Sequence, residues 1–230
     1  MSDSRKRLLG LVTIGQSPRD DIVGQMLPLL PAGLDIRQVG ALDGLTCEQI
    51  AGLAPGPADY VLHTRLRDGQ ANELAVTVGR ERINTLLQSC LKQLECEGAN
   101  PIVLLCTGEF PGLRSDTLLI EPDRLLAGVV RGLGPRRVGV LVPLPSQIEA
   151  AAEKWGVLEA EMVFAAASPY GGQTELTRAA EELGGHPLDL VVMDCVGYTL
   201  AHRRVVMQAT GRPVILASRV VARIVGELVE

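Results

Sequence analysis

The chain has 230 residues, of which 47% are hydrophobic and 3% aromatic, and its formal net charge is -5 at pH 7. This length suits one large α/β domain or two lobes of roughly 100 residues each. The acidic balance disfavours nucleic acid as a partner, and scarce aromatic rings disfavour a site built on ring stacking. No apolar stretch approaches the roughly 18 residues that a membrane span requires.

The N-terminal segment superficially resembles a secretion signal, because basic residues 5–7 precede the apolar run 8–14. It lacks a small-residue cleavage site, and a polar segment follows at once, so we interpret the run as a first buried strand and expect a cytoplasmic protein. Disulfides are then not expected. No metal is expected either, because the three histidines are scattered and no cysteine pair has ligand spacing. The five cysteines are Cys47, Cys90, Cys96, Cys106 and Cys195.

Apolar runs alternate with helical patterns along the whole chain, which favours parallel sheets flanked by helices. The first strands are predicted at 8–14 and 35–39. Between them a helix should begin near Pro18, with Ser17 as its N-cap and two aspartates, at 20 and 21, near its positive end.

Residues 40–80 look like an insertion. Thr46 can cap a short helix there, and a β-hairpin is predicted from the strands 59–65 and 73–78 with a turn at Asp68–Gly69. A helix over 81–97 then leads into the strand that ends at Cys106.

The second half repeats this plan. Its predicted elements are a strand at 137–142, a helix at 146–156, a strand at 160–166, a helix at 173–184, the strand ending at Cys195, a helix at 199–209, a strand at 213–216 and a helix at 218–229. Superposing the halves aligns Thr13 with Val142, Cys106 with Cys195, and residues 120–122 with 215–217. The distance from strand to cysteine is 40 residues longer in the first half, close to the length of the insertion.

Cys106 and Cys195 each stand at the far end of an apolar run and just before a glycine-containing turn. Ligands of open α/β sheets bind outside the carboxyl ends of such strands. Both thiols are therefore predicted at a site. The alternative is that each is a small buried hydrophobic residue, as free cysteines commonly are.

Four segments carry a resemblance to a known family: Thr13–Arg19 (TIGQSPR), Thr64–Gly69 (TRLRDG), Glu121–Pro122 and Asp194–Gly197 (DCVG). In this order, and over essentially the whole chain, they resemble the AroM family. The resemblance implies no particular activity, and the family's name is not evidence for a role in aromatic biosynthesis.

More distantly, the paired cysteines are similar to the cofactor-independent aspartate/glutamate racemase superfamily, which includes hydantoin racemases, a malonate decarboxylase and maleate isomerases. This resemblance implies two pseudo-symmetric, flavodoxin-like α/β lobes around a cleft, and no cofactor. Each lobe of those proteins offers a cysteine followed by Thr or another small residue. Cys106–Thr107–Gly108 matches that pattern, whereas Cys195 precedes Val196–Gly197. This departure removes a hydroxyl that in the racemases helps to hold the substrate carboxylate.

Two thiols suit racemisation, because one base must take a proton from a carbon while one acid delivers a proton to its opposite face. Both sulfurs should then face one pocket, about 7–8 Å apart. Ordinary thiols have a pKa of about 8.5, and helix N-termini lower it. We expect both cysteines at strand-to-helix turns, where N–H groups also favour a carboxylate.

The remaining candidate residues would bind the ligand. Gln16 or Ser17 could bind a ligand oxygen, and Arg19 could pair with a carboxylate in bidentate fashion. Alternatively, Ser17 is only a cap and Arg19 a solvated charge. Thr64 and Arg65 are candidates for a second carboxylate clamp, or else belong to a charged hairpin face. Backbone and side chains of Thr107, Gly108, Val196 and Gly197 complete the predicted substrate-binding set.

The sequence leaves alternative roles for two further polar residues near Cys195. Asp194 either points to the other side of the sheet or orients the thiol or a helix N-terminus. For His202, a surface or packing role is favoured over a role in the site.

We therefore expect an N-terminal lobe at 1–133, with the insertion at about 40–80, and a C-terminal lobe at 134–230 whose last helix could pack back on the first lobe. The leading function is a cofactor-independent racemase, isomerase or lyase for a small carboxylate, with Cys106 and Cys195 as its acid/base pair. The alternative is a non-catalytic small-metabolite binding or regulatory protein. Nucleic acid and membrane are not expected as partners, and the chain could form a homodimer.

Overall fold

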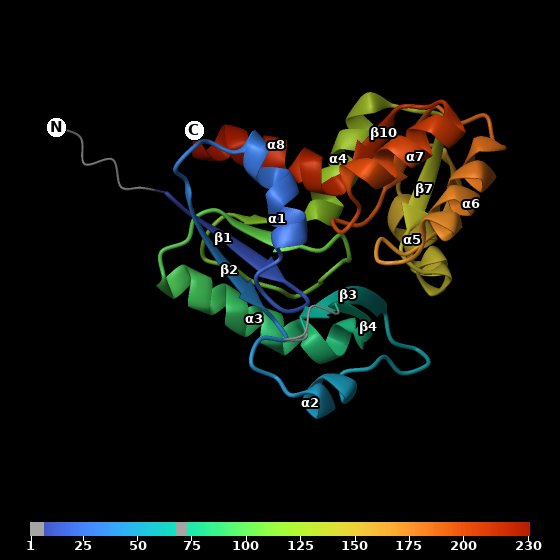
Figure 1. Cartoon of the computed structure of the whole chain (residues 1–230). Coiled ribbons are helices and arrows are strands. Elements are labelled where there is room, and N and C mark those ends of the chain that lie inside the picture. Colours follow the sequence, from blue (N-terminus) through green and yellow to red (C-terminus); the bar gives the residue numbers. More distant parts are fainter. Residues whose placement is uncertain (1–6, 68–72) are drawn as a thin grey trace. The chain divides into compact units, whose positions relative to one another are not determined.

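The computed structural model describes residues 7–67 and 73–230. The chain divides into two compact units. The first comprises the residues up to Pro122 together with Ala222–Glu230, and the second comprises Asp123–Val221. Each unit contains one four-stranded parallel sheet with helices on both faces (Figure 1). The α/β class predicted from the alternating pattern is thereby confirmed.

The sheet of the first unit has the strand order β2-β1-β5-β6. One face is covered by α3 and the other by α1 (Figure 1). The elements of this unit are β1 (Leu8–Thr13), α1 (Asp20–Met26), the 3-10 helix η1 (Leu27–Leu29), β2 (Asp35–Gly40), α2 (Cys47–Ala51), β3 (Val61–Arg67), β4 (Glu73–Gly79), α3 (Arg80–Cys96), β5 (Ile102–Leu105) and β6 (Leu119–Ile120).

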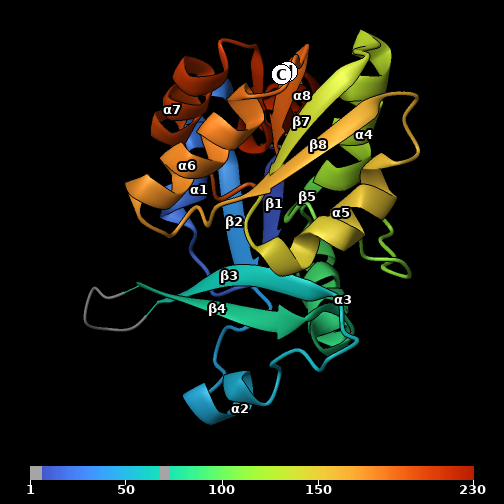
Figure 2. The ribbon, with the colours of Figure 1, turned by 90° about the vertical axis from the view of Figure 1, so that its right-hand side faces the viewer.

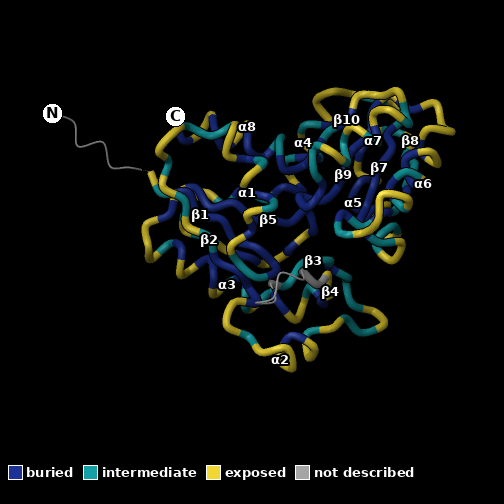
Figure 3. The backbone as a smooth tube through the Cα atoms, in the orientation of Figure 1, coloured by how far each residue is buried: buried dark blue, intermediate teal, exposed yellow. Residues whose placement is uncertain are grey.

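Apolar runs explain the central strands, since every residue of β5 and all of β1 after Leu8 are buried (Figure 3). Strands buried on both faces require such continuous runs. On α3, Ile83, Leu87, Leu91 and Leu94 recur at helical spacing and are fully buried in the core of this unit. The helix ends at Cys96, two residues before Gly98, which adopts a positive φ of 85°.

The predicted insertion is present as a short helix and a hairpin. Thr46 and Gln49 form a capping box at the start of α2, as the sequence predicts. Strands β3 and β4 pair antiparallel, with Val61 opposite Gly79 (Figure 2). The predicted turn at Asp68–Gly69 lies outside the described residues.

The second unit repeats the arrangement, with the strand order β10-β9-β7-β8. Helices α6 and α7 cover one face of its sheet, and α4 and α5 the other (Figure 2). The elements are α4 (Pro122–Leu133), β7 (Arg137–Val142), η2 (Pro145–Gln147), α5 (Ile148–Trp155), β8 (Glu161–Ala166), α6 (Gln173–Gly184), β9 (Leu190–Met193), α7 (Leu200–Thr210) and β10 (Val214–Leu216). Helix α8 (Ala217–Val229) begins in this unit, and its residues from Ala222 onward belong to the first.

The two sheets are copies of one plan, with the flavodoxin-like order second, first, third, fourth strand. Matching glycines lie in the first strand of each copy. A methyl group at Gly10 would lie 2.9 Å from Cβ of Ala99, and one at Gly139 would lie 2.6 Å from Cδ1 of Leu188. In both copies the backbone of the first strand approaches a residue two or three positions before the third strand too closely for a side chain.

The strand pairing places the two cysteines at equivalent positions. The partners of the two glycines are Ile102 in β5 and Val191 in β9. Cys106 and Cys195 each follow their partner residue by four positions. The pseudo-symmetric duplication and the cysteine alignment predicted from the sequence are therefore confirmed.

Two local predictions are wrong. Ser17 is not the cap of α1, because the helix begins only at Asp20 and Arg19 occupies the N-cap position without a side-chain hydrogen bond. Ser17 instead donates its N–H and its hydroxyl to Asp43. Cys106 is not at a strand-to-helix turn, since the next regular element is β6. The intervening loop contains Pro111 and Gly112, the latter at φ 100°, which disfavour a helix.

In the described ranges 7–67 and 73–230, no helix has both the length and the apolar character needed to cross a membrane.

Candidate functional site

Cys106 is the first residue after β5, and its side chain is 9% exposed. The backbone N–H of Gly108 donates to its Sγ at 3.4 Å. A methyl group at Gly108 would lie 2.8 Å from Cδ2 of Leu62 on β3, so the inserted hairpin covers this loop directly. Thr107, between the two, is buried.

Cys195 follows β9 by two residues and is equally buried, at 9% exposure. The N–H of Gly197 donates to its Sγ, also at 3.4 Å. Val196 occupies the position of Thr107 and is buried.

The two thiols thus share one local geometry, in which each accepts an N–H from the glycine two residues later. A hydrogen bond of this kind stabilises a thiolate more than a neutral thiol, because charged acceptors form the stronger bonds. Each thiol therefore has one backbone donor that favours its thiolate, while its burial favours the neutral form.

Asp194, directly before Cys195, is held by α5 of the same unit. Both carboxylate oxygens accept from Lys154 Nζ at 2.9 Å, and Oδ2 also accepts from Trp155 Nε1 at 2.7 Å. The carboxylate and the ammonium are each only 5% exposed. The equivalent position before Cys106 is Leu105, so this buried ion pair anchors only one of the two cysteine loops.

The turn after β1 is held by Asp43, which is not among the residues predicted from the sequence. Its carboxylate accepts from the N–H and the hydroxyl of Ser17, at 2.7 and 2.6 Å, and from the N–H of Gly40 at 2.7 Å. The signal that could have indicated this role is the Asp43–Gly44 turn after β2, where Gly44 has a φ of 73°. Ser17, a predicted ligand-binding residue, therefore donates its hydroxyl to Asp43 in this structure.

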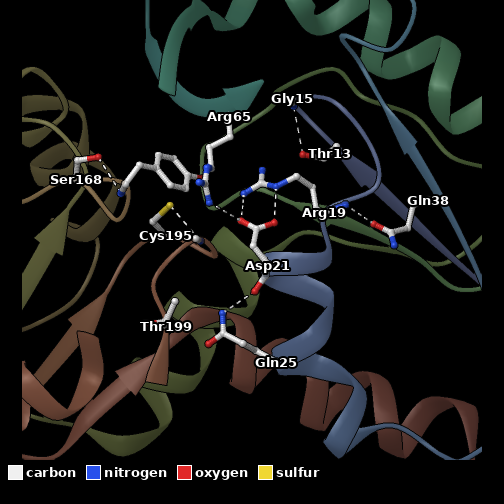
Figure 4. Close-up of polar contacts among 12 residues, drawn as sticks. Thr13, Gly15, Arg19, Asp21, Gln25, Gln38, Arg65, Ser168, Cys195 and Thr199 are labelled. Carbon is white, nitrogen blue, oxygen red and sulfur yellow. Dashed lines mark hydrogen bonds and ion pairs between the residues drawn. The ribbon is translucent and has the colours of Figure 1, made fainter. Parts of the chain in front are cut away.

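Arg19 is nearly buried and binds Asp21 in bidentate fashion, through Nε and Nη2 at 2.9 and 2.8 Å (Figure 4). Arg65 also points toward Asp21, with its Nη1 3.9 Å from Oδ2. Burial alone would raise the pKa of Asp21, but the hydrogen bonds and charge of Arg19, with the charge of Arg65, lower it below its ordinary value. Arg19 is therefore not a solvated charge.

Thr64 on β3 packs against this turn so closely that no side chain would fit at Gly15. Its side chain is fully buried, and its Oγ1 has no hydrogen-bond partner. Buried hydroxyls are rarely left in this state. Gln16, also predicted to bind a ligand oxygen, reaches the carbonyl of Leu42 at 3.5 Å.

Within the first unit, β3 therefore connects most of the predicted residues, since Leu62 contacts the Cys106 loop and Thr64 contacts the β1 turn. The predicted set divides between the units: Gln16, Ser17, Arg19, Thr64, Arg65, Cys106, Thr107 and Gly108 belong to the first, and Cys195, Val196 and Gly197 to the second. In the part of the chain that the structure describes, no group of three or more His, Cys, Asp or Glu side chains could hold a metal ion.

The other cysteines lie on helices. Cys90 is buried on α3, where desolvation and the nearby charge of Asp43 raise its pKa to about 11. Cys47 and Cys96 are exposed. All five cysteines lie among the described residues and are thiols.

His202 has a structural role near the start of α7. Its Nδ1 accepts the N–H of Thr199, whose hydroxyl oxygen accepts the N–H of His202, so the two form a capping box. Burial lowers the pKa of His202 below its ordinary value.

The fold of two similar α/β lobes is shared with solved structures of racemases, a decarboxylase and an isomerase. The allantoin racemase from Klebsiella pneumoniae matches with a TM-score of 0.64 at 13% identity, covering 97% of this chain and 87% of its own. Unliganded arylmalonate decarboxylase matches with a TM-score of 0.61 at 14% identity, covering 97% of this chain and 92% of its own. A maleate isomerase from Pseudomonas putida S16 matches with a TM-score of 0.61 at 16% identity, covering 96% of this chain and 92% of its own.

The family is shown by the sequence itself. The family model described as AroM protein matches residues 9–229, and the chain belongs to the AroM family. No curated protein matches the chain.

Proposed function

We propose that this AroM-family protein is a cofactor-independent racemase, isomerase or lyase for a small carboxylate, and that Cys106 and Cys195 are its acid and base. The observation that carries the proposal is the equivalence of the two thiols. Each lies four residues beyond a matched strand position, and each accepts the N–H of the glycine two residues later.

The chemistry needs no redox partner. One cysteine, as thiolate, takes the proton from the carbon next to the carboxylate, and the electron pair of that C–H bond moves into the carboxyl group. The other cysteine, as thiol, delivers its proton to the opposite face of the same carbon. In a decarboxylation, carbon dioxide leaves instead of the first proton, and one thiol protonates the carbon that it left.

The predicted binding residues of the first unit suit the carboxylate. Arg65 presents a planar guanidinium, the group that best matches a carboxylate in bidentate fashion. Because Arg19 is held in bidentate fashion by Asp21, we assign the ligand-facing role to Arg65 and a positioning role to Arg19. The buried Oγ1 of Thr64 and the side chain of Thr107 add hydroxyl groups.

Solvent hydrogen exchange tests the proposal. The protein is incubated in D₂O with aspartate, allantoin or an arylmalonate, and deuterium at the acidic carbon is followed by NMR; isomerisation of maleate is followed in parallel. We expect turnover of at least one compound, reduced about 10²- to 10⁴-fold in Cys106→Ser and in Cys195→Ser, because each removes a general acid or base. Cys96→Ser, at an exposed thiol of α3, is the matched control and should keep full activity.

A different result would favour the alternative hypothesis of a non-catalytic, metabolite-binding protein. If none of these compounds is converted, yet one raises the melting temperature of the wild-type protein and of both cysteine variants alike, the chain is a metabolite-binding protein and the acid/base roles are wrong.

A further inference from the structure

The second cysteine loop lacks a hydroxyl that the first one has. Thr107 follows Cys106, whereas Val196 follows Cys195, and the strand pairing makes these positions equivalent. Both side chains are buried. A ligand oxygen next to Cys195 would therefore meet an isopropyl group where its counterpart next to Cys106 meets a hydroxyl.

A tyrosine of the same unit brings a hydroxyl to this loop from another direction. Tyr170 lies in the loop between β8 and α6, and a methyl group at Gly197 would lie 2.8 Å from its Oη. The N–H of Gly197 is the donor to Cys195 Sγ. The phenol is thus placed against the residue that holds the thiol. Tyr170 is half-buried, so its side chain remains partly accessible.

The loop that carries Tyr170 is fixed at several points. The N–H of Tyr170 donates to Ser168 Oγ at 3.1 Å, and the N–H of Ser168 donates to Glu175 Oε1 at 3.2 Å. Just before this turn, the carbonyl of Ala167 accepts the buried hydroxyl of Tyr198 at 2.6 Å. A side chain on so constrained a backbone is positioned before any ligand arrives, which reduces the entropy lost on binding.

We propose that Tyr170 is a specificity-determining residue, whose phenol O–H donates a hydrogen bond to a carboxylate or carbonyl oxygen of the ligand at Cys195. It would supply the donor that Val196 lacks. A phenol donates one hydrogen bond and accepts others, and a donor aimed at a charged oxygen forms one of the stronger bonds in proteins. Pro169 and Tyr170 both pack on Gly197, so a larger residue at position 197 would displace this loop.

The inference rests on the proposed function, and the test separates the two. Steady-state kinetics are measured with whichever of aspartate, allantoin, arylmalonate or maleate the wild-type protein converts. Tyr170→Phe keeps the ring and removes the hydroxyl, and should raise KM about 10- to 100-fold, as expected for losing one hydrogen bond to a charged group, with a smaller change in kcat. Adding Val196→Thr to that variant should recover much of the loss. Tyr60→Phe, at a tyrosine that stacks on Arg80 in the first unit, is the matched control.

The outcomes are distinct. An active wild-type protein whose KM is unchanged in Tyr170→Phe overturns the role of Tyr170 and leaves the proposed function standing. If the wild-type protein converts nothing but binds one of the four compounds, the cysteine chemistry fails. Tyr170 then keeps its role only if Tyr170→Phe weakens that binding in calorimetry. A chain that neither converts nor binds any of them refutes both.

Discussion

At the residue scale, the ion pair of Lys154 and Asp194 is the most consequential contact next to a candidate catalytic group. Both charges are removed from water, and a carboxylate in this position is tolerated only because three hydrogen bonds compensate its lost hydration. The pair connects α5 to the segment that carries Cys195, so it fixes the thiol loop as well as the fold.

Removing the cation alone should therefore be costly. Lys154→Met leaves Asp194 buried and charged, and should lower the free energy of unfolding by about 3–5 kcal/mol, as breaking one side of a buried pair does. In the double variant Lys154→Met/Asp194→Asn the neutral amide can still accept from Trp155, and we expect part of the loss to return. Urea denaturation followed by circular dichroism measures both. Equal stabilities of the wild-type and single-variant proteins would show that the pair contributes nothing.

At the element scale, α7 begins with a capping box whose second member can be titrated. Protonation of His202 would remove the acceptor that Nδ1 offers to the N–H of Thr199. Burial lowers the pKa of His202 in the folded chain. The contribution of neutral His202 to stability is therefore complete above the pKa of the unfolded chain, about 6.5. That contribution to stability is lost as the pH falls through the lower pKa that His202 has in the folded chain.

This sign gives a simple experiment. The urea midpoint of the wild-type protein should decrease between pH 7.5 and pH 5 by more than that of His202→Gln, whose amide oxygen can complete the same box without titrating. The NMR titration of His202 in the folded protein should show its midpoint below about 6.5. A parallel pH dependence of the two proteins would contradict the assignment.

Most elements were predictable because local signals agreed with the tertiary fold. The capping box at Thr46, the stripe of Ile83 to Leu94 and the apolar runs before both cysteines gave the helices and strands directly. Strand β6 and helix α4 were missed, since β6 has two residues and α4 contains two glycines, which weaken a helical pattern.

The contacts of the candidate site were predictable only in part. Strand ends identify Cys106 and Cys195, but Asp43 and Tyr170 reach the Ser17 turn and the Cys195 loop from elsewhere in the chain, by contacts that no local pattern contains. The hydrogen bonds by which Asp43 holds Ser17 are likewise made across the chain, between residues 26 positions apart.

At the scale of the whole molecule, the proposed reaction makes a demand on the distance between the two thiols. If both act on one carbon, their sulfurs must lie about 7–8 Å apart in the working enzyme. A bifunctional alkylating reagent of matching length should then join Cys106 to Cys195 within one chain. Peptide mass spectrometry would detect the link, preferably in a Cys47→Ser/Cys96→Ser background that removes the two exposed thiols.

Cys90 provides the internal control for that experiment, because its buried thiol, with a pKa of about 11, should react slowly at neutral pH. Single adducts at Cys106 and Cys195 without a link between them would mean that the two thiols do not serve one substrate.

The paired glycine contacts also supply each thiol with its own spectroscopic probe. The amide protons of Gly108 and Gly197 point at Sγ of Cys106 and Cys195, so each amide resonance should move when its sulfur gains or loses a proton. In a ¹⁵N-labelled sample the two glycine signals would report, separately and without any substrate, which half of the molecule rests as the anion.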